Sequence, residues 1–129
     1  MGRLVMVNNW LKSISKSSQY QFLKLDICNP NKLDDVFKHF KPNLVMHLAA
    51  ESHVDRSIEK PGNFIKTNIF GTYNLLMASH NYWNSKRKGT NKIFFFHHIS
   101  TDEVFGDKKN ISGDFINLNC YRPSSPYSA

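Results

Sequence analysis

The chain has 129 residues, of which 40% are hydrophobic and 13% aromatic, so it has the composition of one globular domain and not of a disordered segment. Lys and Arg outnumber Asp and Glu by 17 to 10, and the formal net charge of +7 would suit an anionic partner such as the phosphates of a nucleotide. The densest basic cluster, Lys86-Arg87-Lys88, has no interleaved aromatic residues for stacking on bases. We therefore interpret it as a solvated loop and expect no nucleic-acid partner.

The cysteines, the histidines and the length of the apolar runs exclude further classes of protein. Cys28 and Cys120 lie far apart, and neither they nor the six histidines show the spacing of metal ligands. We expect reduced thiols and no metal site. No apolar run reaches about 18 residues and no signal-peptide pattern is present. The sequence therefore predicts neither a membrane segment nor secretion, and it favours a cytoplasmic location.

In chain order, the hydrophobic pattern predicts three strands that alternate with two helices. Residues 20–27 have the pattern of a strand, and a helix with one apolar face follows and ends before Pro42. Residues 44–48 are uniformly apolar, as is typical of a buried parallel strand. An apolar stripe after Pro61 indicates a helix of some twenty positions, and the aromatic and β-branched residues 92–99 predict the last strand. This alternation is typical of an α/β protein with a parallel sheet.

Polar residues follow the last predicted strand at Thr101, Asp102 and Glu103. In open α/β sheets, ligands bind in the crevice outside the carboxyl ends of the strands. Neighbouring side chains on an extended segment point to opposite sides, so Asp102 and Glu103 could serve separately as an acid and a base. The commoner alternative is a loop in which both carboxylates cap the next turn and stay solvated. Spacing alone favours that alternative.

Several motifs, taken in their order along the chain, resemble those of a known family. They are Asp26-Ile27-Cys28, residues 45–57, residues 67–72, residues 99–106 and residues 124–129. Together they resemble the dTDP-glucose 4,6-dehydratases, which belong to the extended short-chain dehydrogenase/reductase family. The resemblance implies a Rossmann-like, doubly wound parallel sheet, NAD as cofactor, a nucleotide-sugar substrate (dTDP-glucose) and a homodimer for the full-length enzyme.

The resemblance assigns one group of residues to the cofactor. Asp26 and Ile27 would contact the adenine of NAD, although a capping Asp beside a core Ile would fit the same positions. Leu48, Ala49 and Ala50 would form the strand-end turn along which the dinucleotide lies, and close packing of a strand on a helix is the alternative there. Thr67 would lie on the cofactor side.

The resemblance assigns a second group to the reaction of a lyase. Hydride leaves C4 of the sugar for NAD while Tyr127 takes the proton of the 4-hydroxyl; water is then lost across C5 and C6, and the hydride returns to C6. Glu103 would be the base at C5, and Asp102 the acid that protonates the departing C6 hydroxyl. Thr101 would hydrogen-bond the 4-oxygen, and Ser52 would touch the substrate.

Two other functions stay open. A related epimerase or decarboxylase of nucleotide sugars would share the fold, but it would not need the adjacent acid and base at Asp102 and Glu103. A truncated, non-catalytic product could instead act as an interaction module. The sequence does not say which nucleotide carries the sugar.

The chain also departs from the family pattern. It contains no glycine-rich phosphate loop, and the lysine expected four residues after Tyr127 would fall beyond Ala129. We therefore expect residues 1–129 to be an incomplete NAD-binding domain with three of the family's strands, lacking the first two strands and the C-terminal substrate domain. In the order 3-2-1-4-5 the missing strands would lie between residues 20–27 and 44–48. We expect this chain alone to be inactive and to aggregate or pair through exposed strand edges.

Overall fold

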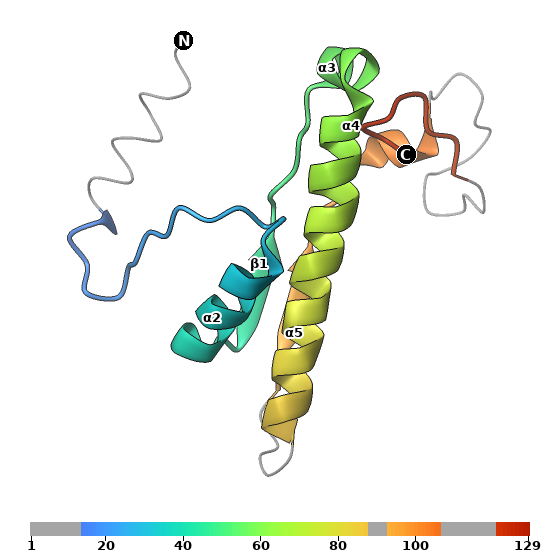
Figure 1. The fold of residues 1–129 in the computed structure, drawn as a ribbon. Helices are drawn as coiled ribbons and strands as arrows, with labels where there is room; N and C mark the ends of the chain where they lie inside the picture. Colours follow the sequence, from blue (N-terminus) through green and yellow to red (C-terminus); the bar gives the residue numbers. More distant parts are fainter. Residues whose placement is uncertain (1–13, 88–92, 107–120) are drawn as a thin grey trace.

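The computed structural model describes residues 14–87, 93–106 and 121–129. Within these ranges the elements follow one another in the order shown in Figure 1: α2 (Pro30–Phe40), β1 (Leu44–His47), α3 (Val54–Glu59), α4 (Pro61–Phe64), the π-helix η1 (Ile65–Gly71), α5 (Thr72–Arg87), β2 (Phe95–His98) and the 3₁₀ helix η2 (Asp102–Phe105). No helix within these ranges is both long and apolar enough to cross a membrane.

The sheet in the described ranges consists of β1 and β2, which run parallel with Leu44 opposite Phe95 and His47 opposite His98. This pairing confirms the predicted parallel α/β arrangement for two of the three expected strands. The core lies between α2, α5 and one face of the sheet, and it is formed by Leu33, Phe37, Leu75 and Ala78 with Val45 and Phe96 packed against them.

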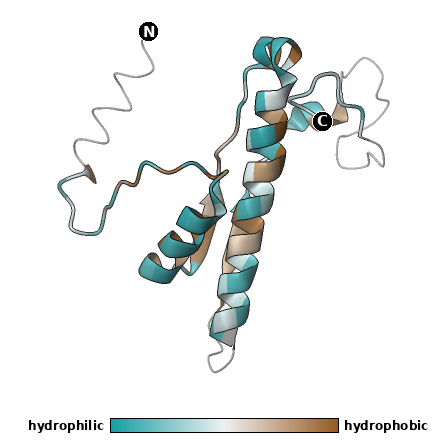
Figure 2. Cartoon of the chain, viewed as in Figure 1, coloured by the Kyte–Doolittle hydropathy of each residue, from teal (hydrophilic) through white to brown (hydrophobic). Residues whose placement is uncertain are grey.

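The other face of the sheet is open. Leu44, Met46 and Phe95 alternate with the inward residues, and 53%, 57% and 60% of their surfaces are exposed. The prediction that residues 44–48 form a fully buried strand is therefore wrong for this structure, because helices cover only one side of β1. Figure 2 shows α2 and α5 beside the strands, each with both hydrophobic and hydrophilic residues along its length.

Helix α2 forms where the sequence predicts it, and its ends show why. The side chain of Asn29 accepts a hydrogen bond from the Lys32 amide at 3.1 Å, and Pro30 occupies the first turn, where its missing N–H costs nothing. Lys41 ends the helix in the left-handed conformation, with φ of 50°. The chain then turns through Pro42 into β1.

Residues 61–87 form one continuous helical rod, in which α4, η1 and α5 succeed one another (Figure 1). The buried Gly71 closes the π-helix, and a Cβ atom there would lie 2.7 Å from the side chain of Ile27. Glycine therefore allows the rod to pack closely against the segment before α2.

The prediction that residues 20–27 form a strand is wrong for this structure. The backbone there has no strand assignment, although Leu25 and Ile27 still pack against the core. A strand needs a neighbour for its amide and carbonyl groups, and the described part of the chain places none beside it. The hydrophobic pattern predicted the packing correctly and the hydrogen bonding wrongly.

Candidate functional site

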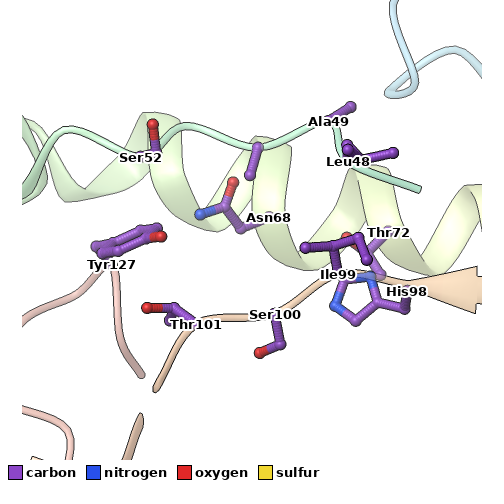
Figure 3. Close-up of a pocket in the computed structure, with 11 residues that line it drawn as sticks. Leu48, Ala49, Ser52, Asn68, Thr72, His98, Ile99, Ser100, Thr101 and Tyr127 are labelled. Atoms are coloured by element: carbon purple, nitrogen blue, oxygen red, sulfur yellow. The ribbon is translucent and has the colours of Figure 1, made fainter. Parts of the chain in front are cut away.

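A cavity of about 230 Å³ lies at the carboxyl ends of β1 and β2, against the helical rod. Figure 3 shows the side chains around it, which come from the segment after β1, the rod, the segment after β2 and the C-terminal turn. The lining residues are Leu48, Ala49, Ala50, Ser52, Asn68, Thr72, His98, Ile99, Ser100, Thr101 and Tyr127. Six of them were predicted from the sequence: Leu48, Ala49, Ala50, Ser52, Thr101 and Tyr127. The structure thus brings together residues that lie up to 79 positions apart in the chain.

The segment after β1 is fixed to the rod by Asn68. Its side-chain oxygen accepts from the Glu51 amide at 2.8 Å, and its side-chain nitrogen donates to the Glu51 carbonyl at 2.9 Å. Both backbone groups of one residue are satisfied by one side chain, which holds Ala50 and Ser52 in place on either side of Glu51. Because Asn68 lies within η1, the π-helix sets the position of this clamp.

Beneath the cavity, His47 is buried with 2% of its surface exposed, and its Nε2 lies 2.9 Å from the Thr72 hydroxyl. Burial lowers the pKa of His47, and the neighbouring His98, whose ring centre is 4.9 Å away, lowers the pKa further. The ring of His47 is therefore neutral near pH 7.

On the opposite wall, Thr101 both lines the cavity and caps η2. Its side-chain oxygen accepts from the Glu103 amide at 3.2 Å. Asp102 and Glu103 are exposed and do not line this cavity. They lie in a 3₁₀ helix rather than an extended segment, so the predicted alternation of their side chains across an extended chain is wrong.

Tyr127 reaches the cavity from a turn at the C-terminal end of the chain. The Ser128 hydroxyl accepts from the amides of Ser124 and Ser125 and contacts the Ser125 carbonyl at 3.1 Å. Ser128 is buried, with 3% of its surface exposed, and it ties the two ends of the turn together. Tyr127 is half-buried at the edge of the cavity (Figure 3).

The other predicted cofactor residues lie outside this cavity. Asp26 accepts from the Cys28 amide at 2.9 Å, and this hydrogen bond lowers the pKa of the Asp26 carboxyl. Ile27 packs against the core, and Thr67 is half-buried in η1. Ile27 instead lines an apolar groove of about 380 Å³ between α2 and β1, which Leu48 and Ala49 also line. Leu48 and Ala49 therefore lie between the two cavities and connect them.

Five lining residues were not predicted from the sequence as site residues: Asn68, Thr72, His98, Ile99 and Ser100. A signal existed for most of them. Asn68 and Thr72 are four positions apart and so share one helix face, and Ser100 adjoins Thr101 at the end of β2. Ile99 has no polar atom in its side chain and gave no signal of its own.

No group of three or more His, Cys, Asp or Glu residues in the described ranges could hold a metal ion. Cys28 is a free thiol, which donates a hydrogen bond to the Lys66 carbonyl with its Sγ 3.3 Å from the carbonyl oxygen. Cys120 lies outside the described residues.

Parallel strands with a cavity at their carboxyl ends are typical of α/β proteins of the Rossmann type. Solved structures of similar fold support this assignment. A dTDP-glucose 4,6-dehydratase from Streptomyces venezuelae (DesIV), solved with NAD bound, matches 94% of this chain with a TM-score of 0.77 and 30% identity, over 34% of its own chain. The UDP-glucose 4-epimerase of Thermotoga maritima matches 87% of this chain with a TM-score of 0.69 and 27% identity, over 33% of its own.

The sequence matches the model of the family described as GDP-mannose 4,6 dehydratase over residues 4–129, and the chain belongs to that family. It is also 48% identical over 119 residues to the dTDP-glucose 4,6-dehydratase of Haemophilus influenzae, and 50% identical over 119 residues to that of Neisseria meningitidis serogroup B. Each match covers 92% of this chain and 35% or 34% of the relative. The resemblance to these dehydratases is thereby confirmed, and the chain spans about a third of their length.

Proposed function

We propose that residues 1–129 form part of the NAD-binding domain of a lyase that converts dTDP-glucose to its 4-keto-6-deoxy product. The observation that carries the proposal is the cavity itself. Six residues that the motifs assign to cofactor, substrate or catalysis come from three separate segments and line one space. Parallel pairing brings the segments after β1 and β2 to one edge of the sheet, and Tyr127 joins them there from the C-terminal turn.

The residues around the cavity fit a dinucleotide. Ala49 and Ala50 have small side chains, which lets a ligand approach the strand end closely, and Leu48 and Ala49 lie between the cavity and the groove that holds Ile27. An elongated cofactor such as NAD could pass from Ile27 to Tyr127 along this line. Asp26 lies beside Ile27 and would reach the adenosine half, and Thr67 would support the cofactor from η1. When bound, NAD supplies a hydride acceptor that later returns the hydride.

The polar groups would then divide the proton transfers. Tyr127 takes the proton of the 4-hydroxyl as C4 is oxidised, and the 4-keto group that results makes the C5 hydrogen acidic. Glu103 removes that proton, and Asp102 protonates the C6 hydroxyl, which departs as water. Thr101 donates to the 4-oxygen, because its oxygen already accepts from the Glu103 amide and its proton remains available. Ser52 contacts the sugar from the opposite wall.

A homodimer is also part of this proposal. The rod has a second apolar face, on which Ile65, Ile69, Tyr73 and Leu76 are 46%, 57%, 57% and 44% exposed. Apolar surface on a helix is stabilised by burial, and these positions recur at helical spacing. We expect Ile69→Lys to shift the sedimentation of the native protein from dimer to monomer, whereas Lys66→Glu should not.

The assay uses the product of the complete reading frame that contains residues 1–129, with dTDP-glucose and NAD. The expected result is loss of one water from the sugar, measured by mass spectrometry. Glu103→Gln should lower turnover by about a hundredfold or more, and the exposed Glu59→Gln in α3 should not. An isomer of equal mass would favour the epimerase. No turnover, in a frame without a glycine-rich loop or a lysine four residues after Tyr127, would favour the interaction module.

A further inference from the structure

A histidine and a threonine beneath the cavity have no role in the reaction as described above. His47 is buried between β2 and the rod, with the ring centres of His98 and Phe96 at 4.9 and 6.2 Å. Its Nε2 lies 2.9 Å from the Thr72 hydroxyl, and Thr72 in turn lines the cavity (Figure 3). The pair connects the sheet interior to the ligand space.

The hydrogen bonding of Thr72 differs from that of other hydroxyls in these helices. The hydroxyls of Ser57, Ser79 and Ser85 each donate to a carbonyl of their own helix at 2.6 or 2.7 Å, which is usual for helical serine. Thr72 has no such bond within the described ranges, and its hydroxyl pairs with His47 instead. Its hydroxyl is therefore held by a group from the sheet.

The tautomer of His47 decides whether the Thr72 hydroxyl donates to Nε2 or accepts from it. The Nδ1 atom is buried and has no hydrogen-bond partner among the described residues. A proton on Nδ1 would leave a buried donor unpaired, whereas a proton on Nε2 is donated to Thr72 and leaves only a lone pair unpaired. Orphaned buried donors are the rarer of the two, so the neutral ring carries its proton on Nε2.

It follows that Thr72 accepts from His47 and keeps its own proton. We infer that His47 is a positioning residue that holds the Thr72 hydroxyl as a donor toward the cavity, where it binds an acceptor oxygen of the ligand. The hydrogen bond that Thr72 accepts from His47 polarises the Thr72 hydroxyl. It thereby strengthens the hydrogen bond that this hydroxyl donates to the ligand. Phe or Leu would fill the same interior volume at position 47 but would leave the Thr72 hydroxyl unoriented.

The inference rests on the proposed function for the identity of the ligand. Thr101 and Tyr127, on the same cavity, are the residues assigned to the reacting end of the sugar. The ligand atom nearest Thr72 would then belong to the nicotinamide riboside half of NAD, which carries carbonyl and hydroxyl oxygens that can accept.

The experiment measures NADH affinity and the His47 tautomer separately, on the purified product of the complete reading frame that contains residues 1–129. Thr72→Val removes the hydroxyl and keeps the shape, and it should weaken NADH binding about three- to tenfold, the effect of one neutral hydrogen bond. Thr72→Ser keeps the hydroxyl and should bind within about twofold of wild type. His47→Leu should weaken binding like Thr72→Val, and the double variant no further, because His47 acts through Thr72. His47→Gln retains a donor and should restore part of the affinity.

Nitrogen NMR of the labelled protein should show the proton of His47 on Nε2, and this measurement needs no ligand. A proton on Nδ1 would overturn the positioning role. If the wild type and Thr72→Val bind NADH with equal affinity, the contact between Thr72 and the ligand is wrong. The proposed function would stay intact. If the wild type does not bind NADH, the proposed cofactor site is wrong, and so is the contact between Thr72 and the cofactor. The NMR result would still show whether His47 donates to the Thr72 hydroxyl.

Discussion

Replacing Asn68 by Ala should release the backbone of Glu51 from the helical rod. The two hydrogen bonds between them, at 2.8 and 2.9 Å, are lost together. Each such bond contributes about 1 kcal/mol net, so the local stability of the segment should fall by about 2 kcal/mol, which corresponds to a roughly thirtyfold increase in its open population. Hydrogen exchange of the Glu51 amide measures that population directly and does not require global unfolding.

Two variants make this test specific. Asn68→Asp can still accept from the Glu51 amide, but it sets a carboxylate oxygen against the Glu51 carbonyl, so it should protect the amide less well than Asn. Asn74→Ala removes a single contact of 3.5 Å to the Ile27 carbonyl and should leave Glu51 unchanged. Equal exchange rates of the Glu51 amide in wild type and Asn68→Ala would refute the clamp.

Three further predictions concern packing, charge and association. Gly71→Ala would place a Cβ atom 2.7 Å from Ile27 and should lower the free energy of unfolding by about 1–3 kcal/mol in denaturant titration, whereas Gly62→Ala, with nothing within 4 Å, should raise it by up to about 1 kcal/mol. The pKa of His47 is lowered in the folded chain, so the unfolded chain takes up a proton as the pH falls through about 6.5 while the folded chain does not. The free energy of unfolding should therefore decrease from about pH 6.5 down to the folded pKa, and an equal slope in His47→Gln would contradict this cause. Met46→Lys, on the open sheet face, should reduce light scattering from the 129-residue chain, whereas equal scattering would show that this face does not drive association.

The sequence predicted the elements whose signals are local. The apolar spacing of Leu33 and Phe37 and the capping residue Asn29 locate α2, and both apolar residues are buried in the core. The strands β1 and β2 and the strand-end cavity also follow from local pattern and from the general position of ligands in α/β sheets.

The sequence could not predict which strands pair or which side chains hydrogen-bond to distant residues. Residues 20–27 have strand composition, but whether they form a strand depends on a neighbour that composition does not specify. The same holds for Asn68 and His47, whose partners Glu51 and Thr72 lie 17 and 25 positions away. A polar residue on an apolar helix or strand signals that a partner exists, but only the fold identifies that partner.

Thr101 shows that capping and function, which the sequence left as alternatives, need not exclude each other. Its oxygen accepts from the Glu103 amide, so Thr101 and not either carboxylate caps η2, and its hydroxyl proton remains for a ligand in the cavity. Asp102 and Glu103 are thereby released from capping. Within the described ranges neither carboxylate has a hydrogen bond or an ion pair, and both are exposed directly beside the cavity wall. Because no partner within these ranges holds either carboxylate, their exposure beside Thr101 is compatible with the acid and base roles proposed for them.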